Sequence, residues 1–197
     1  MKQTTKHRLI GFAAFVVVVV LGIGLFSLWN VWRLREFGVV KEGAIYRSCK
    51  PTEAQLRRVA RRYGIRTIVS LRWKPDPYSQ ELLQELGIRY FKVGLDLRKP
   101  ITGEQIERYL GILDDPQYWP VLVHCGAGEE RAGAMVALYR LKRCGWTREQ
   151  AMEEMKRFDY VPREGNRILV ESVLRFAEEK TRPTQTGAGP SGTTRAE

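Results

Sequence analysis

A short segment between an apolar run and a helix-forming run constrains this chain more than any other feature. Residues 120–123 are Pro-Val-Leu-Val, which is typical of a buried strand, and residues 132–139 are Ala-Gly-Ala-Met-Val-Ala-Leu-Tyr, which is typical of a buried helix. Between them lies His-Cys-Gly-Ala-Gly-Glu-Glu-Arg, at residues 124–131. The pattern predicts that a strand ends at a cysteine and that a glycine-containing turn then opens a helix.

This arrangement has a specific chemistry. The backbone N–H groups at the start of a helix have no partner within the helix and carry partial positive charge, so they bind anions. The same field, with Arg131 facing back across the turn, favours the thiolate of Cys125, because such settings lower the pKa of a cysteine from about 8.5 to roughly 3.5–7.5. We therefore expect a loop that binds a tetrahedral anion and aims a nucleophile at it. The alternative is a buried structural cysteine on an ordinary strand-to-helix turn.

The motif His-Cys-x-x-Gly-x-x-Arg resembles the signature of the cysteine-dependent protein tyrosine phosphatases, and Ala127-Gly128 is most similar to the dual-specificity branch. The resemblance covers about residues 38–180. It implies a central, mostly parallel sheet flanked by helices, and hydrolysis of phosphomonoesters through a phosphocysteine intermediate. The other segments that carry it lie at residues 44–52, 64–72 and 145–152.

The resemblance also implies roles for individual residues. Cys125 would be the nucleophile, Arg131 would bind the phosphoryl oxygens in a bidentate manner, and His124 would support the loop by a hydrogen bond to the backbone. Family members place an aspartate, the general acid, about thirty residues before the cysteine; Asp96 fits this position, and Asp76 is the alternative. The phosphate-binding loop would consist of Gly126, Ala127, Gly128, Glu129, Glu130 and Arg131.

One residue departs from the family's pattern. The family usually has Ser or Thr directly after the loop arginine, whereas this chain has Ala132. In the family, that hydroxyl bonds to the cysteine sulfur and helps it leave when the phosphoenzyme is hydrolysed. The resemblance therefore implies a slow second half-reaction in this chain, with phosphate binding unaffected.

Two carboxylates in the loop bear on the substrate. Relatives that act on phosphoinositides tend to have lysines in this loop, whereas Glu129 and Glu130 would repel a polyphosphorylated headgroup. We therefore expect a phosphorylated protein as substrate, with phosphotyrosine first and phosphoserine or phosphothreonine next. The alternatives are a lipid or small-molecule phosphomonoester and a weakly active phosphate-binding module. Arg72 and Arg98 either line the cleft or lie on the surface.

The composition argues against several other kinds of function. The 197 residues carry a net charge of +11, but no nucleic-acid-binding module is recognisable and the basic residues form no long run. Three cysteines do not make a disulfide framework, although Cys49 could act as a resolving thiol and Cys144 is expected to be packed in a helix. With two histidines and no cysteine pair at ligand spacing, we expect no metal site and no cofactor.

The N-terminal part predicts a membrane anchor. Residues 9–32 carry no charged side chain, and about 20 apolar residues suffice to cross a bilayer core. Trp29 and Trp32 suit an interface at the far end of this span. A cleaved signal peptide is the alternative, but its apolar region is usually only about 7–15 residues long. Basic residues flank both ends of the span, so the side on which the catalytic domain lies stays open.

Beyond the anchor, strand-like runs alternate with helix-like runs. Thr52, Thr102 and Thr147 stand where helices begin, and the last two have the spacing of a capping box. Alternating strands and helices predict an α/β fold whose ligands bind beyond the carboxyl ends of the strands. The expected organisation is a basic arm at residues 1–8, a membrane anchor at 9–32, a juxtamembrane linker at 33–43, a phosphatase domain at 44–180 and a disordered tail at 181–197.

Overall fold

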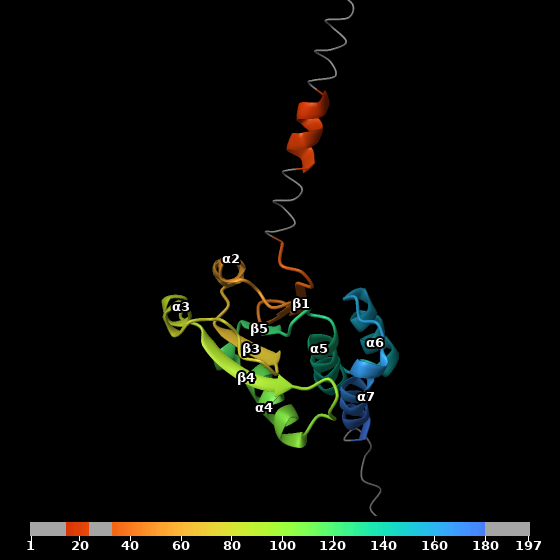
Figure 1. The fold of residues 1–197 in the computed structure, drawn as a ribbon. Helices are drawn as coiled ribbons and strands as arrows, with labels where there is room; N and C mark the ends of the chain where they lie inside the picture. The colour runs from red at the N-terminus through yellow and green to blue at the C-terminus, as the bar shows by residue number, and fades with distance from the viewer. Residues whose placement is uncertain (1–14, 24–32, 180–197) are drawn as a thin grey trace, which may run out of the picture.

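The computed structural model describes residues 15–23 and 33–179, and within the second range it contains one five-stranded sheet. The strand order is β1-β2-β5-β3-β4; β1 is antiparallel to β2, and the other neighbours are parallel (Figure 1). The predicted α/β fold with a mostly parallel sheet is therefore confirmed. The strands are β1 (Gly38–Lys41), β2 (Ile45–Ser48), β3 (Thr67–Arg72), β4 (Arg89–Leu95) and β5 (Val121–His124).

Three of the helices begin at the threonines that the sequence marks. Thr52, Thr102 and Thr147 each accept a hydrogen bond from the backbone N–H of a glutamine three residues later, and that glutamine side chain bonds back to the threonine N–H. These reciprocal bonds satisfy donors that have no partner inside the helix. The helices are α2 (Glu53–Tyr63), α3 (Gln80–Glu85), α4 (Gly103–Asp114), α5 (Glu130–Arg143), α6 (Arg148–Arg157) and α7 (Glu164–Glu179), with a short 3₁₀ helix, η1 (Pro116–Tyr118).

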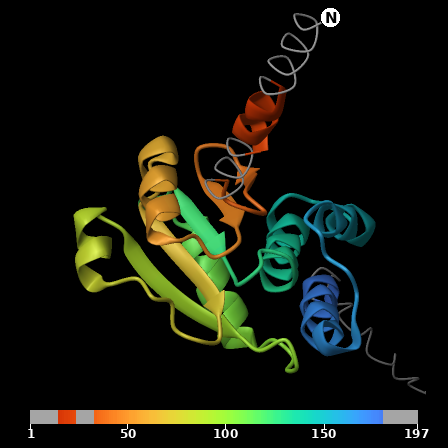
Figure 2. The same ribbon diagram turned by 45° about the horizontal axis from the view of Figure 1, so that its top comes forward.

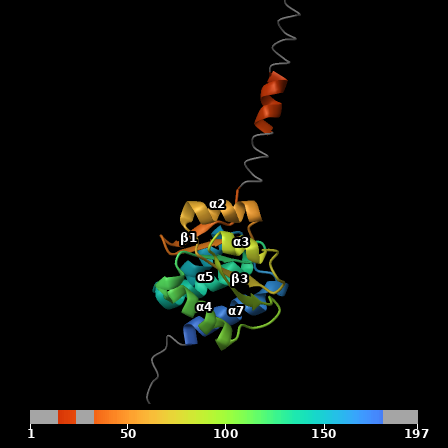
Figure 3. The ribbon, with the colours of Figure 1, turned by 90° about the vertical axis from the view of Figure 1, so that its left-hand side faces the viewer.

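Both faces of the sheet are covered, because successive side chains of a strand point to opposite faces. On β5, Val121 and Val123 pack in the core cluster that includes α4, α5, α6 and α7. Leu122, between them, packs in a second cluster with α2 and α3. Figure 2 shows α2 and α5 on different sides of the strands, and Figure 3 shows α2 above the sheet with α4 and α7 below it. The sheet is thus the middle layer of three.

The segment predicted as a linker, residues 33–43, contains structure of its own. Its second half forms β1, which pairs with β2 through a tight turn at Gly43, where φ is +67°. Leu34 and Val40 are buried in the core. A four-residue strand with one buried side chain has too little periodicity to stand out in a sequence, and its pairing with β2 decides its conformation.

The predicted anchor lies mostly outside the described residues. Residues 15–23 are helical, and the apolar side chains of this helix are exposed. In the parts of the chain that the structure describes, we find no helix that combines the length and the apolar character needed to span a bilayer. The remainder of the predicted span (9–14 and 24–32), the arm at 1–8 and the tail from residue 181 lie outside the described residues, so these remain predictions.

Candidate active site

The catalytic loop leaves the centre of the sheet. β5 lies between β2 and β3 and ends at His124, and α5 begins at Glu130. The loop between them therefore sits beyond the carboxyl ends of three parallel strands, which is where ligands bind in sheets of this type. This is the strand–loop–helix arrangement that the sequence predicts.

The loop wraps around the cysteine sulfur. Cys125 is fully buried, and the backbone N–H of Gly128 donates to its Sγ over 3.2 Å. Gly128 has a φ of +96°, a conformation that side-chain-bearing residues rarely adopt. Its Cα also faces the backbone of Cys49 and the side chain of Glu36 so closely that a Cβ atom would lie 2.7 and 2.5 Å from them. Both constraints require glycine here, and together they turn the loop inward.

Arg131 returns to the loop from the first turn of α5. A Cβ atom on Gly126 would lie 3.5 Å from Arg131 Nη2, so the guanidinium lies beside the loop as expected. Arg131 Nε is buried and has no hydrogen-bond partner among the described residues. The planar fork of this side chain is therefore available for an anion such as a phosphoryl group.

A cavity of about 450 Å³, which we call the phosphate cavity, opens over Gly126 and Arg131. Four of the residues that line it are cationic and one, Asp96, is acidic. Trp73 is 60% exposed and stands at the rim. The lining residues are Arg72, Trp73, Lys74, Leu95, Asp96, Leu97, Arg98, Gly126, Arg131 and Gly165.

The site can be compared with known proteins. The family described as "DSP-PTPase phosphatase fused to NAD+ Kinase" matches residues 32–170. This chain belongs to the dual-specificity-like branch of the cysteine-dependent protein tyrosine phosphatases. It is 30% identical over 125 residues to the inositol diphosphatase SIW14 of Saccharomyces cerevisiae, covering 60% of this chain and 43% of that protein. It is 28% identical over 113 residues to the dual specificity protein phosphatase TpbA of Pseudomonas aeruginosa, covering 57% of this chain and 50% of that protein.

The fold is also that of a solved relative. The core catalytic domain of the PP-IP phosphatase SIW14 from S. cerevisiae, solved in complex with citrate, matches with a TM-score of 0.59 and 26% identity, over 75% of this chain and 93% of that chain. This chain spans about half the length of these two curated relatives. Family membership is shown, while the activity and the substrate of this chain must be argued from the site.

The loop carboxylates do not face the cavity. Neither Glu129 nor Glu130 lines it, and Glu129 Oε1 instead lies 3.9 Å from Arg35 Nη2, on the side of the loop that faces residues 33–37. The repulsion that we expected between these carboxylates and a polyphosphorylated substrate therefore does not come from direct contact within the cavity. Sequence position alone could not show which side of the loop each side chain takes.

Asp96 lies at the cavity, in the loop after β4. Its Oδ1 accepts hydrogen bonds from the backbone N–H of Arg98 over 3.0 Å and from Arg98 Nε over 3.4 Å. The bond from the Arg98 backbone is the main reason why the pKa of Asp96 lies below its usual value of 3.8, with the Arg98 charge acting in the same direction. In this conformation Asp96 is a carboxylate at neutral pH.

Asp76, the alternative acid, lies elsewhere. Its side chain is only 2% exposed, and its carboxylate accepts hydrogen bonds from Ser70, Arg72 and Tyr90. Burial opposes ionisation of Asp76, but the bond from Ser70, the nearby His124 and the other bonds outweigh it and lower its pKa. Asp76 does not line the phosphate cavity, so its position suits a structural role beneath the sheet edge.

His124 connects this buried group to the loop. It is fully buried, its Nδ1 lies 3.2 Å from the carbonyl oxygen of Cys125, and its Nε2 lies 3.6 Å from Asp76 Oδ2. Burial lowers the pKa of His124 despite the attraction of Asp76, so the imidazole is neutral at pH 7. Because a carbonyl oxygen only accepts, Nδ1 carries the proton and steadies the peptide that follows Cys125.

The remaining cysteines and Ala132 have simple environments. Ala132 is fully buried in the first turn of α5, directly after Arg131, and supplies no hydroxyl to the sulfur. Burial raises the pKa of Cys49, so it is a thiol at neutral pH. Cys144 is exposed at the end of α5 and is not packed as we expected. The helix ends there, which carries the side chain out of the core.

Sequence reasoning missed Arg47, which touches the loop from behind. Its side chain is 1% exposed, and its Nη2 donates to the carbonyl oxygen of Gly128. The only signal in the sequence is that Arg47 follows the apolar residues Ile45 and Tyr46; the structure shows that all four residues of this strand are buried. A charged residue in such a run is rarely fully buried unless it has partners.

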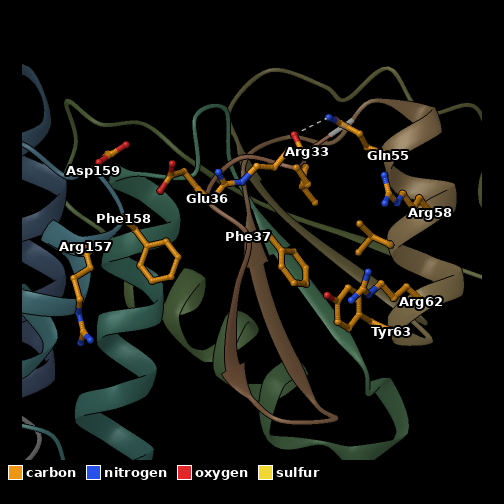
Figure 4. Close-up of a pocket in the computed structure, with 12 residues that line it drawn as sticks. Arg33, Glu36, Phe37, Gln55, Arg58, Arg62, Tyr63, Arg157, Phe158 and Asp159 are labelled. Carbon is orange, nitrogen blue, oxygen red and sulfur yellow. Dashed lines mark hydrogen bonds between the residues drawn. The ribbon is translucent and has the colours of Figure 1, made fainter. Parts of the chain in front are cut away.

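A second cavity, of about 580 Å³, lies where residues 33–37 run between α2 and the end of α6. Figure 4 shows Arg58, Arg62 and Tyr63 of α2 along one wall, Phe158 and Asp159 along the other, and Phe37 between them. Neither Gly126 nor Arg131 lines it, in contrast to the phosphate cavity, so it is not the reaction site. Its Glu36 nevertheless contacts the back of the catalytic loop at Gly128.

Replacing Gly128 by alanine tests the shape of the loop. The new Cβ would overlap Glu36 and the Cys49 backbone and would require a strained φ, so the loop must shift. Because a displacement of about 1 Å costs roughly 10²-fold in rate, we expect Gly128→Ala to lower kcat/KM by at least about 100-fold. Activity within tenfold of the wild type would contradict this account.

The matched control is Gly111→Ala. Gly111 lies inside α4 with open space around its Cα, so alanine should leave activity unchanged and stabilise the protein by up to about 1 kcal/mol. Both variants are measured with p-nitrophenyl phosphate and by thermal unfolding.

Proposed function

We propose that this phosphatase removes a phosphoryl group from a compact, densely phosphorylated small molecule, with inositol diphosphates as the leading class. The observation that carries the proposal is the excess of positive charge at the phosphate cavity. Arg72 is paired with Asp76 and Arg98 with Asp96, whereas Lys74 and Arg131, which line the same cavity, have no acidic partner among the described residues. Clustered cations favour a ligand with several phosphates over one with a single phosphate. The name of the yeast relative, inositol diphosphatase, supports the same class.

The loop performs the first chemical step. The Sγ of Cys125, as thiolate, attacks phosphorus in line with the bond to the leaving group, and an S–P bond forms as the O–P bond breaks. The inward-facing amides of the loop and the Arg131 guanidinium hold the three equatorial oxygens as charge develops on them. Water then attacks the phosphocysteine, releasing inorganic phosphate and restoring the thiolate. No cofactor takes part in this scheme.

The leaving group also favours a diphosphate. A tyrosine leaves as a phenolate whose conjugate acid has a pKa of about 10, so it needs a proton from an acid. A phosphomonoester leaves from a diphosphate as an anion whose conjugate acid has a pKa of about 6. Because Asp96 is ionised at neutral pH in this conformation, the site suits the leaving group that needs no proton.

Phosphotyrosine on proteins, expected from the sequence, remains the second candidate. Trp73 is 60% exposed at the rim, and Leu95 and Leu97 line the same cavity. An aromatic ring and two aliphatic side chains would provide a surface against which a phenyl ring packs. TpbA, a dual specificity protein phosphatase by name, supports this candidate.

We also propose that residues 9–32 attach the protein to a membrane. In the described part of this span, the side chains of Phe15 and Leu21 are 65% and 60% exposed, and they have no protein core around them. Apolar side chains gathered on all sides of a helix suit a lipid environment.

Substrate selection separates the two candidates. The full chain is assayed with an inositol diphosphate, a phosphotyrosyl peptide and a phosphoinositide in vesicles, and we expect the diphosphate to give a kcat/KM at least about tenfold above the others. Cys125→Ser, which removes the nucleophile, should abolish turnover of every substrate and preserve binding. A preference for the peptide would support the second candidate instead, and turnover by Cys125→Ser would refute the mechanism.

The role of Asp96 is tested by the ratio of wild-type to Asp96→Asn activity at different pH values. The acid form of Asp96 is populated only as pH falls toward its lowered pKa, so acid catalysis should be lost as pH rises. On a phosphotyrosyl peptide, we expect the ratio to grow as pH falls from 7 to 4. On a diphosphate, it should stay within about threefold of one. A ratio of 10² or more on the diphosphate at pH 7 would contradict our account of the leaving group.

Ala132→Ser tests which half-reaction limits turnover. If hydrolysis of the phosphocysteine is slow because no hydroxyl follows Arg131, the serine should raise kcat several-fold and reduce the burst of first product seen by stopped flow. Ala134→Ser, at another fully buried position of α5, is the control and should give no gain in kcat. An unchanged or lower kcat in Ala132→Ser would show that this position does not limit the rate.

A further inference from the structure

We propose that Arg47 is a positioning residue for the reaction: from behind the catalytic loop, it holds the peptide between Gly128 and Glu129 so that the N–H of that peptide faces the substrate phosphate. The inference rests on the proposed phosphatase chemistry. It concerns a residue that lines neither described cavity and cannot touch the substrate.

Arg47 reaches the loop through the core of the protein. On β2 it pairs in register with Val123 of β5, two residues before the nucleophile. It lies two residues after Ile45, so its side chain takes the face of the sheet that α5 covers. A Cβ atom on Gly133 of α5 would lie 3.8 Å from Arg47 Nη2. The guanidinium is therefore inserted between the sheet and the first turns of α5.

The contact with Gly128 determines the direction of the next N–H group. Arg47 Nη2 donates to the carbonyl oxygen of Gly128. In a planar trans peptide the C=O and the N–H point in opposite directions, so a carbonyl directed toward Arg47 turns the N–H of Glu129 away from it. The preceding amide, on Gly128, already points to Cys125 Sγ. Arg47 thereby favours the arrangement in which successive amides face the reacting group.

A contribution to the stability of the fold does not explain why an arginine is buried at position 47. Its Nε and Nη1 have no partner among the described residues, and unmade hydrogen bonds of a buried charged group are costly. Glu154, its main opposite charge, is already bound by Arg140, with Nη2 2.7 Å from Oε1. An apolar side chain of similar length often serves as well or better in such a position. A buried charged residue whose hydrogen bonds are not all made departs from the usual pattern of protein cores, and such departures are expected at functional sites.

The surroundings of the guanidinium fix its geometry. The ring of Phe158 lies 3.8 Å from Arg47 Cζ, as a flat support on which the guanidinium stacks. Burial lowers the pKa of Arg47, while the charges of Glu154, Cys125 and Glu36 oppose that change in this order. The second cavity lies on the other side of Phe158 and Glu36, so these two residues separate Arg47 from solvent there.

The experiment compares four variants of the full chain with the wild type: Arg47→Met, Arg47→Gln, Arg47→Lys and the control Arg140→Met. Arg140 is another mostly buried arginine, which binds Glu154 and the carbonyl oxygen of Val40 away from the loop. Each protein is measured for kcat and KM, for thermal unfolding, and for binding of tungstate, a phosphate analogue that reports on the loop without turnover.

We expect Arg47→Met to lower kcat by about 10- to 100-fold, because a displacement of about 1 Å at a reacting group costs up to roughly 10²-fold in rate, and to weaken tungstate binding. Its melting temperature should stay the same or rise. Arg47→Gln and Arg47→Lys, which keep a donor, should recover part of the loss. Arg140→Met should show the reverse pattern, with a lower melting temperature and a kcat within about threefold of the wild type.

Several results would overturn the proposal. They are a kcat of Arg47→Met within threefold of the wild type, equal losses in all three Arg47 variants, and an equal loss of kcat in Arg140→Met. If Arg47→Met does not fold, the kcat values of Arg47→Gln and Arg47→Lys still test the proposal. Both variants keep a hydrogen-bond donor, so a kcat no higher than the background rate in both would contradict the proposal. If the wild type itself turns over no substrate, the proposed function fails, whereas tungstate binding still tests Arg47.

Discussion

The chemistry of this protein depends on one constraint: the loop after β5 must fold around a buried sulfur, to which the backbone N–H of Gly128 donates. The backbone N–H and C=O groups of an unconstrained loop would form hydrogen bonds with water. Here the loop is pressed from outside by Glu36 and the Cys49 backbone, and it is held at the Gly128 carbonyl by Arg47. A glycine with φ of +96° makes that packing possible. Residues distant in the sequence thus create the local field at Cys125.

Much of the fold was predictable because its signals are local. The capping threonines mark the starts of α2, α4 and α6, and the apolar run before His124 marks β5. The position of β5 between β2 and β3 is seen only in the structure, because these local signals do not fix the order of the strands. Cys125 and Arg131 were predictable, since strand, loop and helix are consecutive in the chain.

What the sequence could not provide are the contacts between distant segments. No spacing rule connects Arg47 with Gly128, 81 residues later. The carboxylates of Glu129 and Glu130 were expected to face the substrate, but the first lies toward Arg35. The sequence favours Asp96 over Asp76 only by its distance from Cys125 along the chain, whereas burial and hydrogen bonds show that the two carboxylates lie in different places. Tertiary packing decides each of these cases.

The charges around the phosphate cavity and the ionised state of Asp96 have a common consequence. Arg98, one of the cations that line the cavity, lowers the pKa of Asp96, first through its backbone N–H and then through its charge. If the substrate is a polyanion, the residue that attracts it also keeps the neighbouring aspartate ionised. Such a site gains affinity for its substrate and loses general-acid strength at neutral pH. That exchange is harmless when the leaving group departs as a phosphate anion and costly when it departs as a phenolate. The selectivity between diphosphate and ester would therefore follow from electrostatics alone, without any residue that recognises the organic part of the substrate.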